Sequence, residues 1–338
     1  MTLPETAWAM VAGRKGILAV DESVGTCTKR FEAAGIESTP DSRRDYRELM
    51  FRAPGLGDYV SGAILYDETI RQETADGTPL PQVLEAAGVL PGIKVDTGTK
   101  PLAKAPDESV TEGLDGLAAR LEEYREMGAR FTKWRAVLRV GHDLPSAYCI
   151  HVNVHALGRY AALAQDAGLV PIVEPEVLMD GAHDAAACQR ATEATLTNLF
   201  EELTAQRVGL AGIVLKPNMV VAGMDCPEQP ETAQVAAMTL ETLRKCVPAD
   251  VPGIAFLSGG MTGERACANL DAMVRLGPHP WQLTYSFGRA LQYPALEIWA
   301  GRPENVPAAQ AALIHRCRMS SLARSGEYAP EAEHAFSR

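Results

Sequence analysis

Eight short apolar runs, each rich in β-branched residues and bounded by Gly, Pro or polar residues, recur along the chain. A run of this length and composition is typical of a strand that is buried on both faces. The sequence therefore predicts eight buried strands, at residues 16–23, 61–68, 91–98, 130–140, 169–178, 212–220, 253–260 and 281–289.

Segments rich in Ala, Leu, Glu and Arg separate most of these runs, and their apolar residues have helical spacing. Two examples are 111–127, which would begin at Thr111-Glu112 and is closed by Gly128, and 185–206. Strand alternating with helix is the pattern of a parallel sheet covered by helices. Eight repeats without a visible linker favour an α/β fold of the closed (β/α)8 TIM barrel type over an open, doubly wound sheet. No Gly-x-Gly-x-x-Gly follows the first run, which argues against a dinucleotide-binding domain.

The two ends of the chain lie outside the eight repeats. Residues 1–15 are predicted to form a lead-in helix, and residues 303–338 a closing helix at about 308–322 followed by a short polar tail. We therefore expect residues 1–338 to form a single domain, with the barrel core at about 16–302.

Composition is consistent with this picture and narrows the functional classes. The 338 residues are 46% hydrophobic and 22% charged, which is typical of a globular chain and excludes general disorder. The net charge of −11 argues against nonspecific binding to nucleic acid or to an anionic membrane. No stretch reaches the roughly 18 to 20 apolar residues of a membrane helix, and the opening residues do not resemble a secretory signal. Seven scattered cysteines without a Cys-x-x-Cys are expected to be reduced, which points to a cytoplasmic protein.

Charged residues occur near the ends of five of the predicted strands, mostly with a spacing of two. In a barrel, alternate residues face the interior, and the active site lies at the carboxyl ends of the strands. Each such pair would therefore face the same side of its strand at the barrel mouth. Charges in buried strands are unfavourable unless they are paired or functional, so the alternative is a set of structural ion pairs. The residues are Asp21 with the uncharged Ser23, Lys94 and Asp96, Lys133 and Arg135, Glu174 and Glu176, and Lys216.

Lys216, within Ile-Val-Leu-Lys-Pro-Asn, is the sharpest single candidate. Apolar surroundings and nearby cations favour the neutral form of a lysine, and a neutral amine is a nucleophile towards carbonyl carbon. Carboxylates on the preceding run could move the protons that iminium formation requires. The alternative is a lysine that only pairs with Glu174 or Glu176. Lys94 and Lys133 are rival nucleophiles, and spacing does not separate the three.

Two groups of residues predict anion sites. Ser258-Gly259-Gly260 after the seventh run and Gly288-Arg289 after the eighth would let backbone N–H groups approach an anion, as in the phosphate site of many barrels. A second cluster comes from the early runs. Two anion sites on either side of a lysine suggest a substrate that is phosphorylated at both ends. The second cluster consists of Lys94, Ser23, Thr26, Lys29 and Arg30.

Metal chemistry is the competing mechanism. His151 and His155 form the one histidine pair with a ligand-like spacing of four residues. They precede the fifth run, far from the charged strand ends, and are better interpreted as part of a surface or interface helix. We therefore expect no metal site and no cofactor.

The strings that carry this chemistry resemble the class I (Schiff-base) fructose-bisphosphate aldolases, from about residue 15 to residue 328. The resemblance implies a metal-independent, homotetrameric enzyme of glycolysis and gluconeogenesis. Such an enzyme reversibly cleaves fructose 1,6-bisphosphate to dihydroxyacetone phosphate and glyceraldehyde 3-phosphate. The shared strings are GILAVDES, ILYDETIRQ, GIKVD, GLDGL, KWRAVL, VPIVEPE, LKPNMV, FLSGG and LTYSFGRALQ.

The resemblance also implies roles for individual residues. Lys216 corresponds to the Schiff-base lysine, Glu174 to the general acid/base and Glu176 to a supporting carboxylate. Asp21 would hold the C4 hydroxyl, with Lys133 as its cationic partner. The implied phosphate-binding residues form two sets. They are Ser258, Gly259, Gly260, Ser286, Gly288 and Arg289 for the phosphate at C1, and Ser23, Thr26, Arg30 and Lys94 around the distal phosphate, with Arg135 as a further substrate-binding residue.

The chain departs from the family pattern at four places. Thr26 ends the DESTGS-like string, Thr97 replaces the last lysine of GIKVDKG, and Met261 follows Ser-Gly-Gly in place of Gln. The final residues EHAFSR lack the terminal tyrosine of vertebrate isozymes, which puts tail-dependent modulation of turnover in doubt. Two alternative functions remain at this point: another Schiff-base barrel, such as a transaldolase, and a noncatalytic barrel scaffold.

Overall fold

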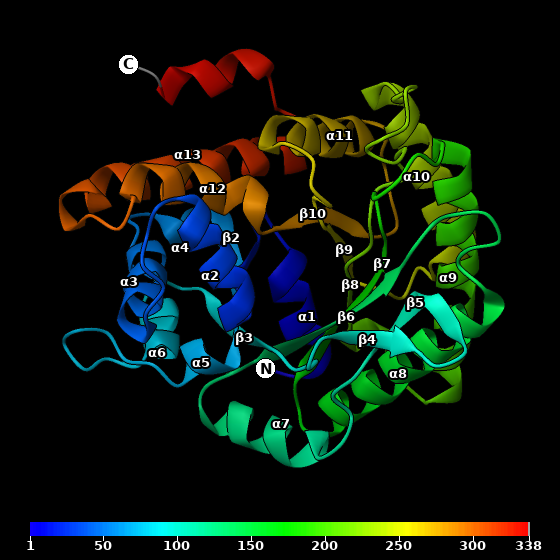
Figure 1. The fold of residues 1–338 in the computed structure, drawn as a ribbon, viewed down its shortest axis with the longest axis horizontal. Coiled ribbons are helices and arrows are strands. Elements are labelled where there is room, and N and C mark those ends of the chain that lie inside the picture. The colour runs from blue at the N-terminus through cyan, green and yellow to red at the C-terminus, as the bar shows by residue number, and fades with distance from the viewer. Residues whose placement is uncertain (337–338) are drawn as a thin grey trace.

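A closed barrel of eight parallel strands forms the centre of the computed structural model, which describes residues 1–336 (Figure 1). The barrel closes because β1 pairs with both β2 and β10. All eight predicted runs contain or overlap a strand, so the expected (β/α)8 fold is confirmed. In spatial order the strands are β1 (Gly16–Ala19), β10 (Gln282–Phe287), β9 (Gly253–Phe256), β8 (Val214–Leu215), β7 (Val170–Val177), β6 (Phe131–Leu138), β3 (Leu90–Lys94) and β2 (Val60–Leu65).

Helices surround the barrel, as Figure 1 shows. The predicted helix at 185–206 is α9 (Ala185–Ala205), whose N-terminus is capped by Asp184 accepting from the Ala187 N–H at 2.7 Å. The predicted closing helix is α13 (Val306–Arg324), two residues longer at each end. The other helices are α2 (Val24–Ala33), α3 (Pro40–Phe51), α4 (Leu56–Tyr59), α5 (Asp67–Ile70), α6 (Leu80–Ala86), α7 (Leu117–Glu126), α8 (Ala147–Asp166), α10 (Thr232–Cys246), α11 (Gly263–Arg275), α12 (Arg289–Trp299) and the 3₁₀ segments η1 (Leu210–Gly212), η2 (Pro303–Asn305) and η3 (Pro330–Phe336).

The lower part of the barrel interior is apolar and filled by side chains. Phe131 is fully buried there, and its ring occupies space that a side chain at Gly62 or Gly92 would fill. A Cβ at Gly92 would lie 2.1 Å from Phe131 Cε2. Inward-facing residues from six strands and from α1 complete this cluster, so this end of the barrel is a packed core.

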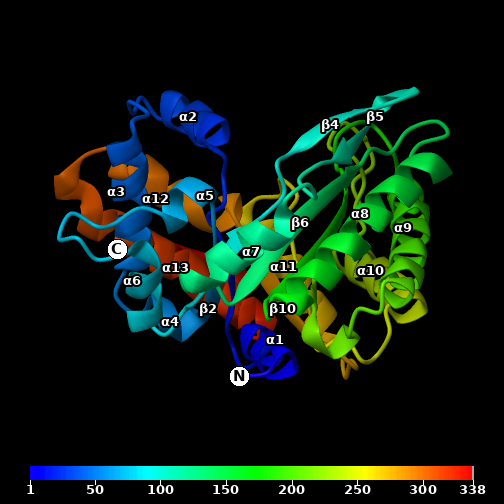
Figure 2. The same cartoon turned by 90° about the horizontal axis from the view of Figure 1, so that it is seen from below.

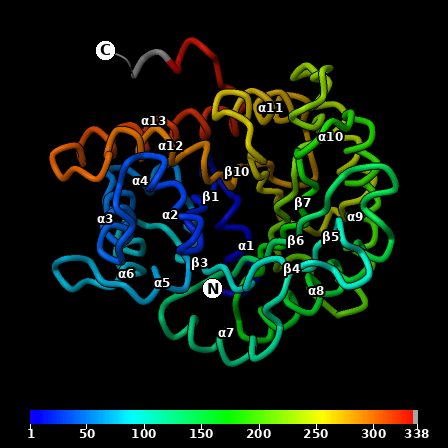
Figure 3. The backbone as a smooth tube through the Cα atoms, viewed as in Figure 1, coloured from blue at the N-terminus to red at the C-terminus, as the bar shows by residue number. Residues whose placement is uncertain are grey.

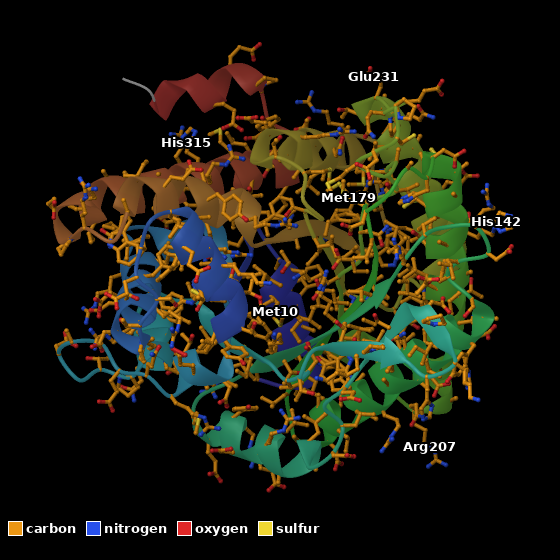
Figure 4. All side chains as sticks on the ribbon, viewed as in Figure 1. Met10, His142, Met179, Arg207, Glu231 and His315 are labelled. Carbon is orange, nitrogen blue, oxygen red and sulfur yellow. The ribbon has the colours of Figure 1, made fainter. Side chains whose placement is uncertain are left out.

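The lead-in helix α1 (Leu3–Val11) closes the amino-terminal end of the barrel. Its Met10 is fully buried and lies near the centre of the barrel in Figure 4. Ser61 of β2 donates to the Met10 carbonyl at 2.6 Å, which ties the helix to the sheet. Figure 2 shows α1 and α2 at opposite ends of the barrel, so the end near α2 is the open one.

The prediction of a helix at 111–127 is wrong in its first half. Residues Thr99–Leu102 (β4) and Ala105–Thr111 (β5) form an antiparallel hairpin in which Thr111 pairs with Thr99, and α7 begins only at Leu117. Gly113 and Gly116 have φ values of +129° and +66°, which a helix cannot accommodate. In Figure 2 this hairpin and α2 lie on either side of the open end of the barrel.

The amino-terminal and carboxyl-terminal segments lie at different parts of the barrel. The amino terminus is at the closed end of the barrel, whereas η3 lies outside α13, on the periphery (Figure 3). Tyr328 is buried, and its N–H donates to Asp271 at 2.9 Å. Residues 337–338 of the tail, and the side chains of 334–336, lie outside the described residues. Within the described part of the chain no helix is long and apolar enough to cross a membrane.

Candidate active site

A cavity of about 710 Å³ opens at the carboxyl ends of the barrel strands. It brings together all of the predicted site residues except Gly260. All four i, i+2 pairs line it. The pairs on β6 and β7 do so by strand alternation, whereas Asp21, Ser23 and Asp96 lie in the segments just after β1 and β3. The predicted residues that line it are Asp21, Ser23, Thr26, Arg30, Lys94, Lys133, Arg135, Glu174, Glu176, Lys216, Ser258, Gly259, Ser286, Gly288 and Arg289.

Three buried side chains and the partly buried Asp21 form a continuous chain of ion pairs across the floor of the cavity. Lys216 Nζ lies 3.3 Å from Glu174 Oε1, and Glu174 Oε2 lies 3.2 Å from Lys133 Nζ. Lys133 Nζ in turn lies 2.6 Å from Asp21 Oδ2. Alternating positive and negative groups balance the loss of hydration that burial imposes on each charge.

The surroundings determine the charge of these groups. Burial by itself would raise the pKa of Asp21, but Lys133, Lys216 and Lys94 lower it well below its ordinary value. Burial opposes ionisation of Glu174 in the same way, and Lys133, Lys216 and Arg135 lower its pKa. For Lys133, burial favours the neutral amine, but Asp21 and Glu174 raise its pKa above the ordinary value. Both carboxylates and Lys133 are therefore charged at neutral pH.

This geometry separates the lysines that the sequence left as rivals. Lys133 is held as a cation by two carboxylates, whereas Lys216 is buried with one carboxylate at 3.3 Å. Lys94 lies at the side of the cavity, with its Nζ 5.1 Å from the centre of the Tyr66 ring. Lys216 is therefore the lysine best placed to be both enclosed and next to a proton acceptor.

The next pair on β6 and β7 lies nearer the mouth of the cavity. Arg135 Nε forms an ion pair with Glu176, and burial, which lowers the pKa of Arg135, is outweighed by Glu176, which raises it. Asp96 accepts from the N–H groups of Arg135 and Gly98. Its carboxylate thereby connects the loop after β3 to β6.

One end of the cavity presents unused hydrogen-bond donors. Gly259 and Gly260 have φ values of +58° and +105°, and Gly288 precedes α12 with no side-chain cap. The N–H groups at the start of α12 are therefore available to an anion. Ser286 Oγ is buried and has no partner among the described residues. Gly260 does not line the cavity but lies behind Arg289, whose Nη2 would be 3.4 Å from a Cβ at this glycine.

A second set of donors lies at the opposite side, at the start of α2. Ser23 caps this helix by accepting from the Thr26 N–H, and the two hydroxyl oxygens lie 3.1 Å apart. Lys29, Arg30 and Lys94 add positive charge near them. The residues of both anion sites expected from the sequence, apart from Gly260, thus line one cavity. Its lining has seven cationic side chains and five carboxylates, so its local charge is opposite to the net charge of the chain.

Sequence reasoning missed two of the charged or aromatic residues that line this cavity, Glu22 and Tyr293. Glu22 is buried and forms ion pairs with Arg30 and Arg47, the latter at 2.6 Å. Strand alternation would place Glu22 on the side opposite to Asp21, but residues 20–23 lie beyond the end of β1, where alternation does not apply. Asp96 was recognised as charged but was given no role. Tyr293 lies within a helix, where no signal in the sequence indicated a substrate contact.

The histidine pair lies away from this cavity, on α8. His151 and His155 are exposed, their ring centres are 6.4 Å apart, and His155 pairs with Glu202 at 2.9 Å. Among the described residues no group of three or more His, Cys, Asp or Glu side chains is arranged to hold a metal ion. The interpretation of this pair as part of a surface helix therefore agrees with the structure.

Comparison with known proteins gives a consistent result. The family described as fructose-bisphosphate aldolase class-I matches residues 2–338. A probable fructose-bisphosphate aldolase class 1 of Xylella fastidiosa is 54% identical over 96% of this chain and 98% of its own length. Fructose-bisphosphate aldolase 1 of Toxoplasma gondii is 47% identical over 96% and 90% of the two chains. The solved structure of fructose-bisphosphate aldolase from Plasmodium falciparum, in complex with TRAP and a small-molecule inhibitor, is 45% identical with a TM-score of 0.96, covering 97% of this chain and 95% of that one.

The match of the family over nearly the whole chain and the identity to several members agree with the lysine-centred cavity of the barrel. This chain therefore belongs to the class I fructose-bisphosphate aldolases, lyases that act through a Schiff base on a lysine.

Proposed function

We propose that this chain cleaves fructose 1,6-bisphosphate reversibly, with Lys216 as the residue that forms the Schiff base. The observation that carries the proposal is the contact between the buried Lys216 amine and Glu174, at 3.3 Å, on the floor of a cavity with an anion site at each side. The C2 carbonyl of the open-chain sugar would lie over this amine, and the two phosphates would orient the chain between them.

Glu174 moves protons during formation of the Schiff base. As a carboxylate, it accepts a proton from Lys216, and the neutral amine attacks C2. Glu174 then donates a proton to the hydroxyl of the carbinolamine, which leaves as water, and the iminium forms. Glu176, paired with Arg135, is a supporting carboxylate at the mouth of the same strand.

The iminium withdraws the electrons of the breaking C3–C4 bond. Asp21 holds the C4 hydroxyl, and Glu174 accepts its proton as glyceraldehyde 3-phosphate leaves. The electron pair remains on the enamine, which is protonated at C3 and hydrolysed to dihydroxyacetone phosphate and free Lys216. Lys133, held positive between Asp21 and Glu174, stabilises both carboxylates through these steps.

The anion sites support a substrate with two phosphates. Ser258, Gly259, Ser286, Gly288 and Arg289 would bind the phosphate at C1, with Gly260 allowing the close approach of Arg289. The hydrogen-bond donors at the opposite side of the cavity would bind the distal phosphate. This second set is Ser23, Thr26, Arg30 and Lys94, with Arg135 as a further substrate-binding residue of the cavity.

The wider assignments follow from the family. We propose that the whole chain acts as one barrel domain, that it assembles as a homotetramer, and that it works in the cytoplasm in glycolysis and gluconeogenesis. A relative from Arabidopsis thaliana that is 48% identical, named fructose-bisphosphate aldolase 4, cytosolic, supports the location. Size-exclusion chromatography with light scattering tests the assembly.

Turnover assays test the proposal against its alternatives. We expect cleavage of fructose 1,6-bisphosphate, with activity unchanged by chelators. A loss that zinc reverses would indicate metal-dependent chemistry instead. Absence of turnover would favour a noncatalytic scaffold, and activity on a transaldolase substrate alone would favour another Schiff-base barrel.

A further inference from the structure

Arg30, at the distal side of the cavity, is in contact with the aromatic ring of Tyr293. The Arg30 Cζ atom lies 5.6 Å from the ring centre, and both side chains line the cavity. A guanidinium group at this distance is attracted by the negative face of the ring. Tyr293 belongs to α12, whereas Arg30 belongs to α2, so the contact joins two helices that are far apart in the sequence.

A buried carboxylate holds Arg30 from a second direction. Glu22 forms an ion pair with Arg30 and is itself held by Arg47, at 2.6 Å, and by the side-chain amide of Gln292, at 2.8 Å. Burial alone would raise the pKa of Glu22, but Arg47 and Arg30 lower it, so Glu22 stays ionised. Arg30 is thus fixed by Glu22 through charge and by Tyr293 through its ring face.

Two consecutive residues of α12 act on Arg30. Gln292 does so through its hydrogen bond to Glu22, and Tyr293 through its ring. The backbone of α12 is itself held firmly at this point. Pro294 cannot donate to the carbonyl of Ala290, and Arg316 Nε donates to that carbonyl instead, at 3.3 Å. The backbone that carries Tyr293 is therefore held from behind the cavity, while Tyr293 itself remains 40% exposed.

The same helix contributes to both anion sites. Gly288 and Arg289 at its start line one side of the cavity, and Tyr293 contacts Arg30 at the other. One rigid element thus relates the two phosphate positions, and it does so through a residue that acts on Arg30 and not on the reacting carbons.

We propose that Tyr293 is a positioning residue for the distal phosphate, which it serves by holding the Arg30 guanidinium in place, and that it strengthens the preference for a ketose with phosphates at both ends. This inference rests on the proposed function. It predicts that the loss of the ring weakens binding of a bisphosphate and leaves a ketose with a phosphate only at C1 little affected.

The test compares fructose 1,6-bisphosphate with fructose 1-phosphate in steady-state assays. For Tyr293→Ala we expect a two- to tenfold rise in KM for the bisphosphate with kcat little changed, and a correspondingly smaller preference over the monophosphate. Tyr293→Phe keeps the ring and should behave as the unmodified protein. In an Arg30→Ala background, Tyr293→Ala should have no further effect on KM. Tyr148→Ala, which removes a similarly exposed tyrosine on α8, is the matched control.

Three results would overturn the role of Tyr293: an unchanged substrate preference in Tyr293→Ala, an equal loss for both sugars, or a full loss in Tyr293→Phe, which would assign the effect to the hydroxyl. If the unmodified protein cleaves neither sugar, the proposed function itself is contradicted. Normal cleavage with an unchanged preference in the variant contradicts only the role of Tyr293.

Discussion

The two halves of the barrel interior differ sharply although the same strands build both. On β6, Phe131 fills the lower half, and Lys133 and Arg135 line the upper half. On β7, Ile172 lies in the apolar half and Glu174 in the charged half. All of these side chains point into the barrel and are two residues apart along their strands. The interior therefore changes from apolar to charged between one inward-facing residue and the next.

The two halves of the barrel interior therefore have different roles. Burial of apolar surface and close packing stabilise the lower half, where α1 excludes water. In the upper half, burial of charges opposes folding unless each charge has a partner. The pairing of Lys216, Glu174, Lys133 and Asp21 meets this requirement and at the same time keeps a nucleophile beside a proton acceptor. We therefore expect loss of the nucleophile or of its proton acceptor in the upper half to reduce turnover, and loss of a charge partner there to reduce stability as well. Substitutions in the lower half should affect stability and leave turnover little changed.

The largest effect should come from Lys216→Met. Loss of the amine removes the covalent route, and we expect kcat/KM to fall on the order of 10⁴-fold or more. Circular dichroism should show a folded protein, because Glu174 retains Lys133. Retention of most of the activity in this variant would contradict the division between the two halves.

Glu174→Gln should have the next largest effect. The amide keeps the shape of the side chain but cannot accept and return a proton, so kcat should fall by about 10²- to 10⁴-fold. Rapid-mixing kinetics should show that dehydration of the carbinolamine is slower than in the unmodified protein. As a comparison, Glu202→Gln changes a carboxylate outside the cavity, on α9, and should leave turnover unchanged.

Lys133→Met tests the coupling of charge and stability in the upper half. At neutral pH the substitution leaves Asp21 without its nearest cation, and urea unfolding should show a loss of about 3–5 kcal/mol. In the unmodified protein, Lys133 lowers the pKa of Asp21 and Glu174 below their ordinary values of 3.8 and 4.5. The stability that depends on these lowered values is present above about pH 4.5 and is lost as the pH falls through the folded-state values.

The difference in unfolding free energy between Lys133→Met and the unmodified protein should therefore narrow as the pH is lowered from 6 to below 4. A difference that stays constant with pH would show that lost packing, and not charge, explains the effect.

Gly92→Ala tests the lower half and should have the smallest effect of the four. A Cβ at this position would overlap the Phe131 ring, and we expect a loss of about 1–3 kcal/mol in unfolding free energy with kcat little changed. Phe131→Leu in the same chain should recover part of the loss. Gly209→Ala is the control, because its nearest neighbour, Gln165 Oε1, would lie at an ordinary distance of 3.6 Å. Equal losses in both glycine variants would argue against packing as the cause.

Most of the barrel was predictable because its signal is local. Buried strands leave apolar runs, and the charged residues at their ends stand out against these runs. The hairpin β4–β5 was not predictable in this way, since its polar sequence, which includes Lys100, Asp107 and the buried Glu108, carries no apolar periodicity. The helix expected from Thr111 failed because Gly113 and Gly116 require a backbone that only tertiary contacts reveal.

The site could be predicted as a set of residues but not as a network. The resemblance indicated Lys216 and Glu174. The succession of ion pairs that runs from Lys216 through Glu174 and Lys133 to Asp21 depends instead on how four strands align. Tyr293 was missed because its contact with Arg30 joins α12 and α2, which no short sequence motif reports.

The most direct test of the account is to locate the covalent adduct. The protein is incubated with dihydroxyacetone phosphate, reduced with borohydride, digested and analysed by mass spectrometry. We expect the reduced adduct on Lys216, with no adduct in Lys216→Met. An adduct on Lys94 or Lys133 in the unmodified protein, or turnover with no adduct at any lysine, would contradict the assignment of Lys216 as the nucleophile.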